Sequence, residues 1–324
     1  MEHPKTLLEA IKYFSDEQVC IDAVAHMKWS NGEAICPQCH AKEPYYLATQ
    51  KRWKCRKCKK QFSVKVGTIF EDSPISLQKW LPAMWLLCNC KNGISSWEIH
   101  RALGVTQKTA WFMLQRIRLA LERDNKHKLG GSGGGPVEVD ETFVGPNLQK
   151  MHRARRLKLK AGECGQTKAI VMGMLDRDLR QVRAKVIPNV KREVLQGEII
   201  EEIEKGSTVY TDGYTSYDDL ARRNYIHETV NHVEEYVRGE VHTQGIENFW
   251  SLLKRGLKGT YVAVEPFHLD RYVTEQIFRY NNRATKDNPL NDSDRFQLAL
   301  SQISGKRLTY AELTGKVSQR PEVC

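Results

Sequence analysis

Three acidic residues, Asp140, Asp212 and Glu247, have the types and the sequence settings that metal-dependent chemistry requires. Asp140 lies inside Val137–Val144, whose alternation is typical of a strand, and an acid in such an apolar strand is costly unless it is paired or binds metal. Asp212 ends a short β-branched run before a glycine, and functional groups gather at strand ends of this kind. Carboxylate oxygens are the ligands that Mg²⁺ prefers, and three carboxylates can hold two ions about 3.5–4 Å apart. Two such ions activate the attacking oxygen and stabilise the leaving oxygen when a phosphodiester is cleaved.

Glu247 lies on a predicted amphipathic helix, seven residues before Lys254. Seven residues are two helical turns, so both side chains share one face and are about 10 Å apart, too far for a salt bridge. The other side of the helix carries apolar residues at the spacing of a buried stripe: Ile246, Phe249, Trp250, Leu253 and Leu257. The arrangement suits a carboxylate that binds metal and a lysine that contacts phosphate. Taken singly, the pair is more typical of a solvated helix face, and Asp212 of a turn.

Strands and helices that could position these acids follow residue 136. In the first strand, alternation places Glu138, Asp140 and Thr142 on one face and Glu141 on the other. The order β-β-β-α-β-α-β-α predicts a mixed sheet flanked by helices. We expect strands at Val137–Val144, Lys168–Leu175, Gln181–Ile187, Thr208–Thr211 and Ile226–Val230, and helices at Arg192–Glu204 and around Glu247.

Four cysteines form two CxxC pairs, Cys36 with Cys39 and Cys55 with Cys58, and fifteen residues separate the pairs. This spacing is typical of a structural Zn²⁺ site in which two turns each present two thiolates. Basic residues surround the second pair, and they fit a DNA-facing ribbon and compensation of the site's negative charge equally well. The other cysteines have no ligand spacing: Cys20, Cys88, Cys90, Cys164 and Cys324.

Residues 94–116 have the pattern of a helix-turn-helix motif. Ser95 and Glu98 form a capping box, Gly104 opens a tight turn, and Thr106 caps the second helix. Three residues at the start of the second helix would face bases or phosphates of DNA: Gln107, Lys108 and Thr109. The alternative is an ordinary helical hairpin, because sequence signatures of this motif are loose.

The chain has 324 residues, a net charge of +11 and a pI of about 9.1, and 40% of its residues are hydrophobic. These values predict a soluble protein of two or three domains, and the basic charge favours nucleic acid as a partner. No signal peptide pattern and no apolar run near the roughly 20 residues of a membrane span are present, so we expect a cytoplasmic protein without a membrane partner. The acid-free basic segment Lys150–Lys160 is predicted to contact the DNA backbone, with a solvated loop as the alternative.

We therefore expect a multidomain α+β and α/β protein. The predicted parts are a helical lead-in at 1–30, a zinc ribbon at 31–72, a helix-turn-helix domain at 75–128, a Gly-rich linker at 129–136, a catalytic domain at 137–290 and a C-terminal tail at 291–324. The linker is expected to be flexible because of its composition. A phosphate-binding glycine loop would follow a strand and open a helix, whereas this segment follows a helix and opens a strand.

Several segments together resemble the ISXO-two-like group of bacterial insertion-sequence DDE transposases. They are the two zinc ligand pairs, Lys91–Ser96, Leu103–Val105, Lys108–Trp111, Val139–Thr142, Ile246–Arg255, Phe278–Arg283 and Gly305–Tyr310. The resemblance covers roughly residues 15–315 and is most specific in the Ile246–Arg255 helix. It implies an RNase H-like catalytic fold with flanking helices, whose sheet has the strand order 3-2-1-4-5. The first and fourth strands are then neighbours.

The same resemblance implies roles for particular residues. Asp140, Asp212 and Glu247 would form the DDE triad and bind two Mg²⁺ ions, or Mn²⁺ in their place. Lys254 would contact transposon-end DNA, together with Arg255, while Zn²⁺ would have a structural role. His242 and Asn248 lie near Glu247 in the sequence but are assigned no function.

The expected function is transposition of an insertion sequence. The ribbon and the helix-turn-helix would bind the terminal inverted repeats in double-stranded DNA, and the triad would cleave the element ends and join their 3′-hydroxyls to target DNA. Joining two ends requires at least two subunits, so we expect a homo-oligomer that works at the nucleoid in the bacterial cytoplasm. Two alternatives remain: a DNA-binding regulator with an inactive catalytic domain, and a nuclease that cuts without joining.

Overall fold

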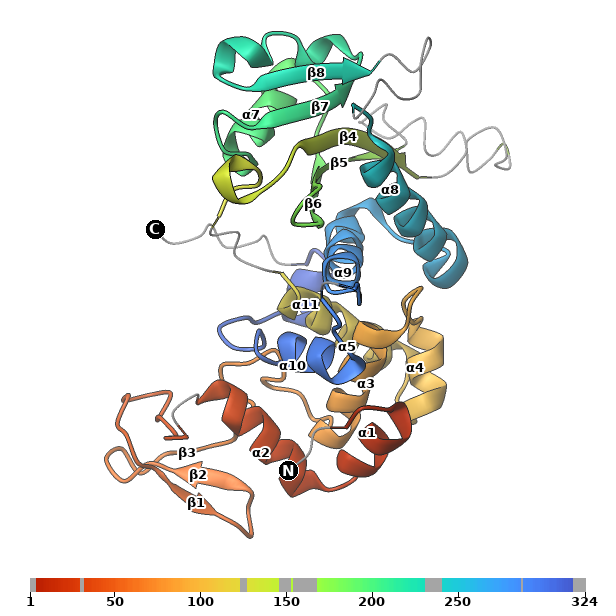
Figure 1. Ribbon diagram of the computed structural model, residues 1–324. Helices are drawn as coiled ribbons and strands as arrows, with labels where there is room; N and C mark the ends of the chain where they lie inside the picture. Colours follow the sequence, from red (N-terminus) through yellow and green to blue (C-terminus); the bar gives the residue numbers. More distant parts are fainter. Residues whose placement is uncertain are drawn as a thin grey trace. The chain divides into compact units, whose positions relative to one another are not determined.

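The computed structural model describes residues 4–29, 32–122, 127–145, 153, 168–230, 241–286 and 288–316. The chain folds into two compact units (Figure 1). Unit 1 combines Met1–Arg123 with Asn282–Cys324, and unit 2 consists of Asp124–Asn281. Among the described helices, none is long and apolar enough to cross a membrane.

Unit 2 is built on a five-stranded sheet with the order β6-β5-β4-β7-β8. Its strands are β4 (Val137–Val144), β5 (Ala169–Asp176), β6 (Gln181–Ile187), β7 (Thr208–Asp212) and β8 (Ile226–Val230). β4, β5 and β6 are antiparallel, while β7 and β8 run parallel to β4. In chain order this is 3-2-1-4-5, so the expected RNase H-like mixed sheet is confirmed, and the predicted strand positions hold to within one residue.

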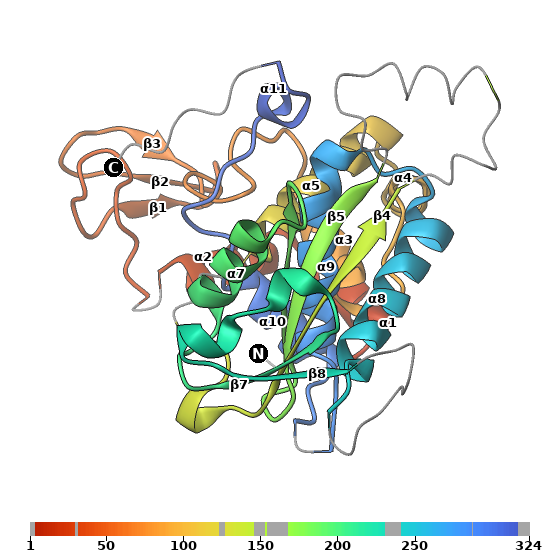
Figure 2. The same cartoon turned by 90° about the horizontal axis from the view of Figure 1, so that it is seen from above.

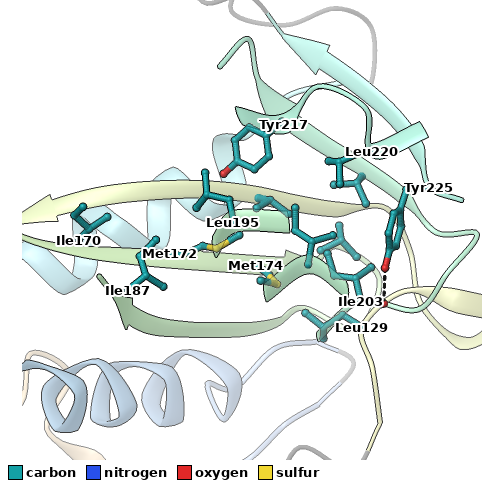
Figure 3. Close-up of a cluster of buried hydrophobic side chains, with 14 residues drawn as sticks. Leu129, Ile170, Met172, Met174, Ile187, Leu195, Ile203, Tyr217, Leu220 and Tyr225 are labelled. Atoms are coloured by element: carbon teal, nitrogen blue, oxygen red, sulfur yellow. Dashed lines mark hydrogen bonds between the residues drawn. The ribbon is translucent and has the colours of Figure 1, made fainter. Parts of the chain in front are cut away.

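Helices cover the sheet of unit 2 from opposite sides (Figure 2). The helix α7 (Arg192–Glu202) packs on one face, where strand and helix side chains form a continuous apolar core (Figure 3). The helices α8 (Gln244–Gly256) and α9 (Leu269–Asn281) contribute to the core on the other face. Gly173 in β5 permits this approach, because a Cβ at that position would lie 2.5 Å from the Trp250 ring.

The Gly-rich segment at residues 130–136 is an ordered part of unit 2, not the flexible linker that its composition predicted. The carboxylate of Asp176, which is 0% exposed, accepts hydrogen bonds from the backbone N–H groups of Gly130 (2.9 Å) and Gly135 (3.1 Å). Between them Gly131–Gly133 forms a turn of 3-10 helix, η1. Composition could not reveal this order, because the acceptor lies some 40 residues later in the chain.

Gly134→Ala should destabilise unit 2. The added Cβ would lie 2.2 Å from the Asp176 carboxylate and 2.9 Å from the Gly130 carbonyl oxygen, and overpacking of this kind costs about 1–3 kcal/mol. Gly133→Ala is the matched control, because a Cβ there meets nothing within 4 Å. Urea denaturation of the full chain measures both variants, and equal midpoints would show that the segment is not closely packed.

Unit 1 contains a three-stranded antiparallel ribbon and a helical core. The ribbon strands are β1 (Tyr45–Leu47), β2 (Arg52–Lys54) and β3 (Gln61–Phe62). The helices are α1 (Leu7–Tyr13), α2 (Glu17–Lys28), α3 (Leu77–Asn89), α4 (Ser96–Leu103), α5 (Gln107–Ala120), α10 (Asp292–Leu300) and α11 (Tyr310–Leu313). The almost fully buried α3 contacts α2, α5 and α10, so it is the centre of this unit.

Residues after 281 fold into unit 1, although we expected the catalytic domain to reach 290 and a tail to follow at 291–324. The ring of Phe296 in α10 lies 5.2 Å from that of Phe14 and 5.5 Å from that of Trp85. Arg116 in α5 donates to the backbone carbonyl of Leu308. The described part of this segment is therefore held by long-range packing, which local sequence patterns do not encode.

Candidate active site

The pairing of β4 with β7 brings Asp140 and Asp212 to the same level of the sheet. The parallel register pairs Val137 with Val209 and Glu138 with Tyr210. Two residues further along each strand are Asp140 and Asp212, and side chains two residues apart in a strand point to the same face. The sheet therefore places Asp140 beside Asp212, as the strand order 3-2-1-4-5 implied.

Asp140 is linked directly to the helix that carries Glu247. Its Oδ2 accepts a hydrogen bond from the indole N–H of Trp250 in α8 (2.9 Å), and its Oδ1 accepts one from the backbone N–H of Glu141 (2.8 Å). Burial raises the pKa of Asp140 to about 6, although the two hydrogen bonds lower it. The negative charges of Asp212 and Glu247 raise this pKa further, so the three carboxylates share one electrostatic environment.

Glu247 and Asp212 are each oriented by their own segment of chain. Glu247 lies in the first turn of α8, where the helix dipole favours a negative charge, and its Oε1 accepts from the hydroxyl of Thr243 (3.0 Å). Asp212 is the last residue of β7, and its Oδ1 accepts from the backbone N–H of Tyr214 (3.2 Å). Thr243, which is 1% exposed, had no predicted role.

Glu141 follows Asp140 in the chain but faces the other side of the sheet, as alternation predicted. The hydroxyl of Tyr217, a fully buried residue of the α7-side core, donates to its Oε1. Burial raises the pKa of Glu141 to about 7. The two neighbouring acids thus have different surroundings, and only Asp140 lies on the α8 face.

The chemistry of the three carboxylates fits divalent metal. They offer only hard oxygen ligands. Burial, and to a smaller extent the charges of Asp212 and Glu247, raise the pKa of Asp140, and a bound cation would offset this cost of the charged form. Among the residues that the structure describes, only the four ribbon cysteines have ligand atoms that all lie within 4.8 Å of one another. For the three carboxylates, the fit to divalent metal therefore rests on the hard oxygen chemistry of their side chains.

Asp140→Asn should stabilise the protein near pH 7.5 in the absence of added Mg²⁺. The pKa of Asp140 in the folded protein, about 6, exceeds its ordinary value of 3.8, so the folded state binds more protons between these values and loses stability as pH rises through them. Removing the charge should therefore gain about 1–3 kcal/mol at pH 7.5 and almost nothing at pH 4. Thermal unfolding at both pH values tests this, and a gain that does not depend on pH would contradict it.

Lys254 and Arg255 lie on the last turns of α8. Lys254 is half-buried and Arg255 is exposed, so both can be reached by a ligand on the outer surface of the helix. The contact of Lys254 and Arg255 with transposon-end DNA stays a prediction. The basic segment Lys150–Lys160 lies outside the described residues, apart from Arg153.

The four predicted zinc ligands come together in the ribbon of unit 1. The sulfur of Cys36 lies 3.7 Å from that of Cys58, and the sulfur of Cys39 lies 3.5 Å from that of Cys55. Four sulfurs around a tetrahedral Zn²⁺, with Zn–S bonds of about 2.3 Å, are about 3.8 Å apart. The donor set and its spacing therefore fit a structural Zn²⁺ ion.

The two ligand turns have the same backbone design. In the first, the N–H of Cys36 donates to Ala41 O (3.0 Å), and in the second the N–H of Cys55 donates to Lys60 O (2.9 Å). Each turn closes with a left-handed residue directly after its second cysteine: His40 (φ 53°) and Lys59 (φ 61°). This repetition explains why both CxxC pairs present their thiols in the same way.

Two helices joined by a tight turn, α4 and α5, occupy the segment with the predicted helix-turn-helix pattern. The Ser95–Glu98 capping box forms, Gly104 is left-handed (φ 60°), and the Thr106 hydroxyl accepts from the backbone N–H of Thr109 (3.1 Å).

The residues expected to face DNA already have partners within unit 1. Gln107 donates to Ser96 Oγ (2.8 Å), Lys108 Nζ lies 4.7 Å from the Tyr310 ring centroid, and the Thr109 hydroxyl bonds that of Thr106. Their DNA contact stays a prediction.

Sequence reasoning assigned no role to Arg177 and none beyond a strand face to Glu138. Glu138 is 1% exposed, and its Oε1 accepts from Arg177 Nε at 2.6 Å. The only signal in the sequence was the charged run Asp176-Arg177-Asp178, and such a run is typical of a solvated turn. The ion pair lies next to the triad and becomes evident only from the sheet pairing.

Two family models match the chain. Residues 132–281 match the ISXO2-like transposase domain, and residues 15–61 match the transposase zinc-ribbon domain. A Halobacterium salinarum protein described as an uncharacterized protein in transposable element ISH50 is 29% identical over 261 residues, which are 76% of this chain and 85% of that protein. A Haemophilus influenzae protein described as an uncharacterized transposase-like protein is 33% identical over 106 residues, which are 33% of this chain and 85% of that protein.

Among solved structures, a chain of the simian T-cell lymphotropic virus intasome in complex with PP2A regulatory subunit B56 gamma is similar at 14% identity and a TM-score of 0.29. The match covers 62% of this chain and 66% of that chain. A likeness of this size does not bear on the fold.

Proposed function

The chain belongs to the ISXO2-like transposases of the IS1595 family, and we propose that it cleaves the ends of its insertion sequence and joins them to target DNA. The acids that would carry this reaction are Asp140, Asp212 and Glu247. The main support is that β4, β7 and α8 each bring one of these acids to the same face of the sheet, and that Trp250 bonds α8 to Asp140. The proposed place of action is the nucleoid.

The three carboxylates would hold two Mg²⁺ ions, or Mn²⁺ in their place. When bound, these ions supply positive charge for in-line displacement at phosphorus. The protein's own contribution is to fix the carboxylates before DNA arrives. Trp250 and the Glu141 N–H hold both oxygens of Asp140, and Thr243 orients Glu247, so little reorganisation is needed on binding.

Cleavage and joining are then two displacements of the same kind. In the first, a water oxygen bonds to the scissile phosphorus, the bond from phosphorus to the 3′-oxygen breaks, and the element end keeps a 3′-hydroxyl. In the second, this hydroxyl bonds to a target phosphorus and releases a target 3′-hydroxyl. One phosphodiester is exchanged for another, so the joining step needs no external energy source.

Recognition of DNA is assigned to unit 1 and to the outer end of α8. The zinc ribbon and the α4–α5 helix-turn-helix would bind the terminal inverted repeats, with Gln107, Lys108 and Thr109 at the start of α5. Lys254 and Arg255 would contact backbone phosphates near the cleaved bond. The net charge of +11 supports a polyanionic partner, and joining two ends together calls for a homo-oligomer.

An assay that separates binding, cleavage and joining tests the proposal. The purified protein is incubated with Mg²⁺, a labelled duplex that carries the element end and a supercoiled target plasmid. We expect a metal-dependent nick at the element boundary, followed by labelled plasmid. End binding without any cleavage would favour a DNA-binding regulator, and cleavage without labelled plasmid would favour a nuclease; either result would overturn the proposed transfer activity.

A further inference from the structure

One arginine in unit 2 contacts all three elements that carry the candidate triad. Arg177, in the turn between β5 and β6, donates from Nε to Glu138 Oε1 in β4 (2.6 Å). Its guanidinium carbon lies 4.7 Å from the ring centroid of Tyr210 in β7. Its Nη2 donates to the backbone carbonyl of His242, which precedes the N-cap residue of α8 (2.6 Å). We call these four residues the Arg177 clamp.

Each contact of the clamp lies close in the chain to one of the three acids. Glu138 precedes Asp140 by two residues, and Tyr210 precedes Asp212 by two residues. Glu138 and Tyr210 are themselves register partners in the β4–β7 pair. A shift of any one contact would therefore move the acid on the same element, since two strand residues span only about 7 Å.

The clamp also fixes the start of α8, which carries Glu247. The N-cap residue Thr243 makes no side-chain cap hydrogen bond, and instead Glu138 Oε2 accepts the backbone N–H of Ile246 (2.9 Å). A carboxylate from the sheet thus takes over the capping of this helix and meets the positive end of its dipole. The first turn of α8 is therefore hydrogen-bonded to Glu138, the same side chain that binds Arg177.

The first turn of α8 packs closely against the sheet at Gly245. A Cβ on Gly245 would lie 2.4 Å from the Leu175 side chain and 2.9 Å from Glu138 Oε2. Glu138 is 1% exposed, and the side chain of Arg177 is 18% exposed, so their ion pair is largely shielded from water. Removing one partner of such a pair leaves the other charge uncompensated, which makes the pair a strong constraint on geometry.

The ring of His242 also contacts Arg177. Arg177 Nη2 lies 2.8 Å from His242 Nδ1, and because an arginine can only donate, Nδ1 is the acceptor in this contact. The 3.6 Å approach of Nδ1 to Glu138 Oε1 is then a contact between two acceptors that the guanidinium bridges. Lysine could not reproduce this fork of donors together with stacking on Tyr210.

We propose that Arg177 is a positioning residue that sets Glu247 against Asp140 and Asp212. It acts through Glu138, Tyr210 and the start of α8, and it does not touch the reacting atoms. This inference rests on the proposed function only in taking Asp140, Asp212 and Glu247 as the residues that carry the reaction. The geometric claim, that Arg177 holds the start of α8 on the sheet, can be tested without DNA cleavage.

The test compares Arg177→Met and Arg177→Lys with Arg180→Met, which removes an exposed positive charge from the same turn. Hydrogen exchange is measured well below the unfolding temperature, and Mn²⁺ affinity is measured by electron paramagnetic resonance. In Arg177→Met we expect the first-turn amides of α8 to exchange at least about 10-fold faster while β4 and β5 amides stay protected. The Mn²⁺ Kd should rise about 10-fold, whereas Arg180→Met should match the parent.

Catalysis and stability complete the test. With end DNA, Arg177→Met should cleave about 10–100-fold more slowly at unchanged end binding, and Arg177→Lys should recover only part of the loss. The double variant Arg177→Met/Glu138→Gln removes both charges, so it should recover thermal stability without recovering the cleavage rate.

Two results would overturn the proposal: unchanged exchange and Mn²⁺ affinity in Arg177→Met, or full recovery of cleavage along with stability in the double variant. If the parent itself fails to cleave, the proposed function fails, yet the exchange and Mn²⁺ measurements still decide whether Arg177 positions α8.

Discussion

Asp140→Asn should reduce Mg²⁺-dependent cleavage of the element end at least about 1,000-fold, because it removes one of the three charged ligands that would hold the metal ions. The loss should occur without damage to the fold. Asparagine keeps one acceptor oxygen for the Trp250 indole and gives up the bond from the Glu141 N–H, while the buried charge that it removes is itself unfavourable in the metal-free protein. End binding should therefore stay within about 3-fold of the parent, since unit 1 is expected to supply it.

Glu141→Gln is the matched control for this loss. Glu141 is the next residue of β4, it is a carboxylate of similar burial, and its pKa is also raised by burial. Its partner, however, is the Tyr217 hydroxyl on the other face of the sheet, and a glutamine oxygen can still accept that bond. Cleavage by this variant should stay within about 3-fold of the parent. Equal losses in the two variants, measured with labelled end DNA, would contradict the assignment of Asp140.

Loss of one ribbon thiolate should have the second largest effect. In Cys39→Ala the Zn²⁺ site keeps only three ligands, and structural zinc contributes about 10–16 kcal/mol to folding of small zinc domains. Apart from zinc, the ribbon is stabilised by strand pairing and by an aromatic group in which the Trp53 ring lies 5.0 Å from that of Trp29 and 4.7 Å from that of Tyr46. We expect zinc content to fall below half and end binding to weaken at least about 10-fold.

The measurements for this variant are zinc content by atomic absorption, tryptophan emission and end binding by gel shift. Cys90→Ala serves as the control, because Cys90 has no ligand spacing and lies directly after α3. The control should keep its zinc, its emission maximum and its affinity for DNA. A Cys39→Ala protein with a full zinc content and unchanged emission would show that the four thiols are not a metal site.

Local features of the fold could be predicted from the sequence, because they depend on neighbouring residues. Alternation located β4 and its two faces, and capping residues such as Ser95 and Thr106 located the ends of α4 and α5. The zinc ligands followed from spacing alone. The strand order came from the family resemblance, and it was the order that allowed Asp140 to be placed beside Asp212.

Features that depend on distant partners could not be predicted. The Gly-rich segment is held in place because Asp176 is buried beneath it, and the described part of the segment after 281 is held because Phe296 packs against Phe14 and Trp85. The Arg177 clamp is of the same kind, since four stretches of chain meet at one guanidinium. Composition and periodicity describe single segments, whereas these contacts exist only in the folded protein.

Asp140→Cys tests whether Asp140 binds the metal on which DNA cleavage depends. A thiolate is a poor ligand for Mg²⁺ but an acceptable one for the softer Mn²⁺. Cleavage by Asp140→Cys should therefore be nearly absent in Mg²⁺ and should recover at least about 10-fold in Mn²⁺, relative to the parent in each metal. A variant whose cleavage relative to the parent is the same in both metals would contradict direct metal binding by Asp140.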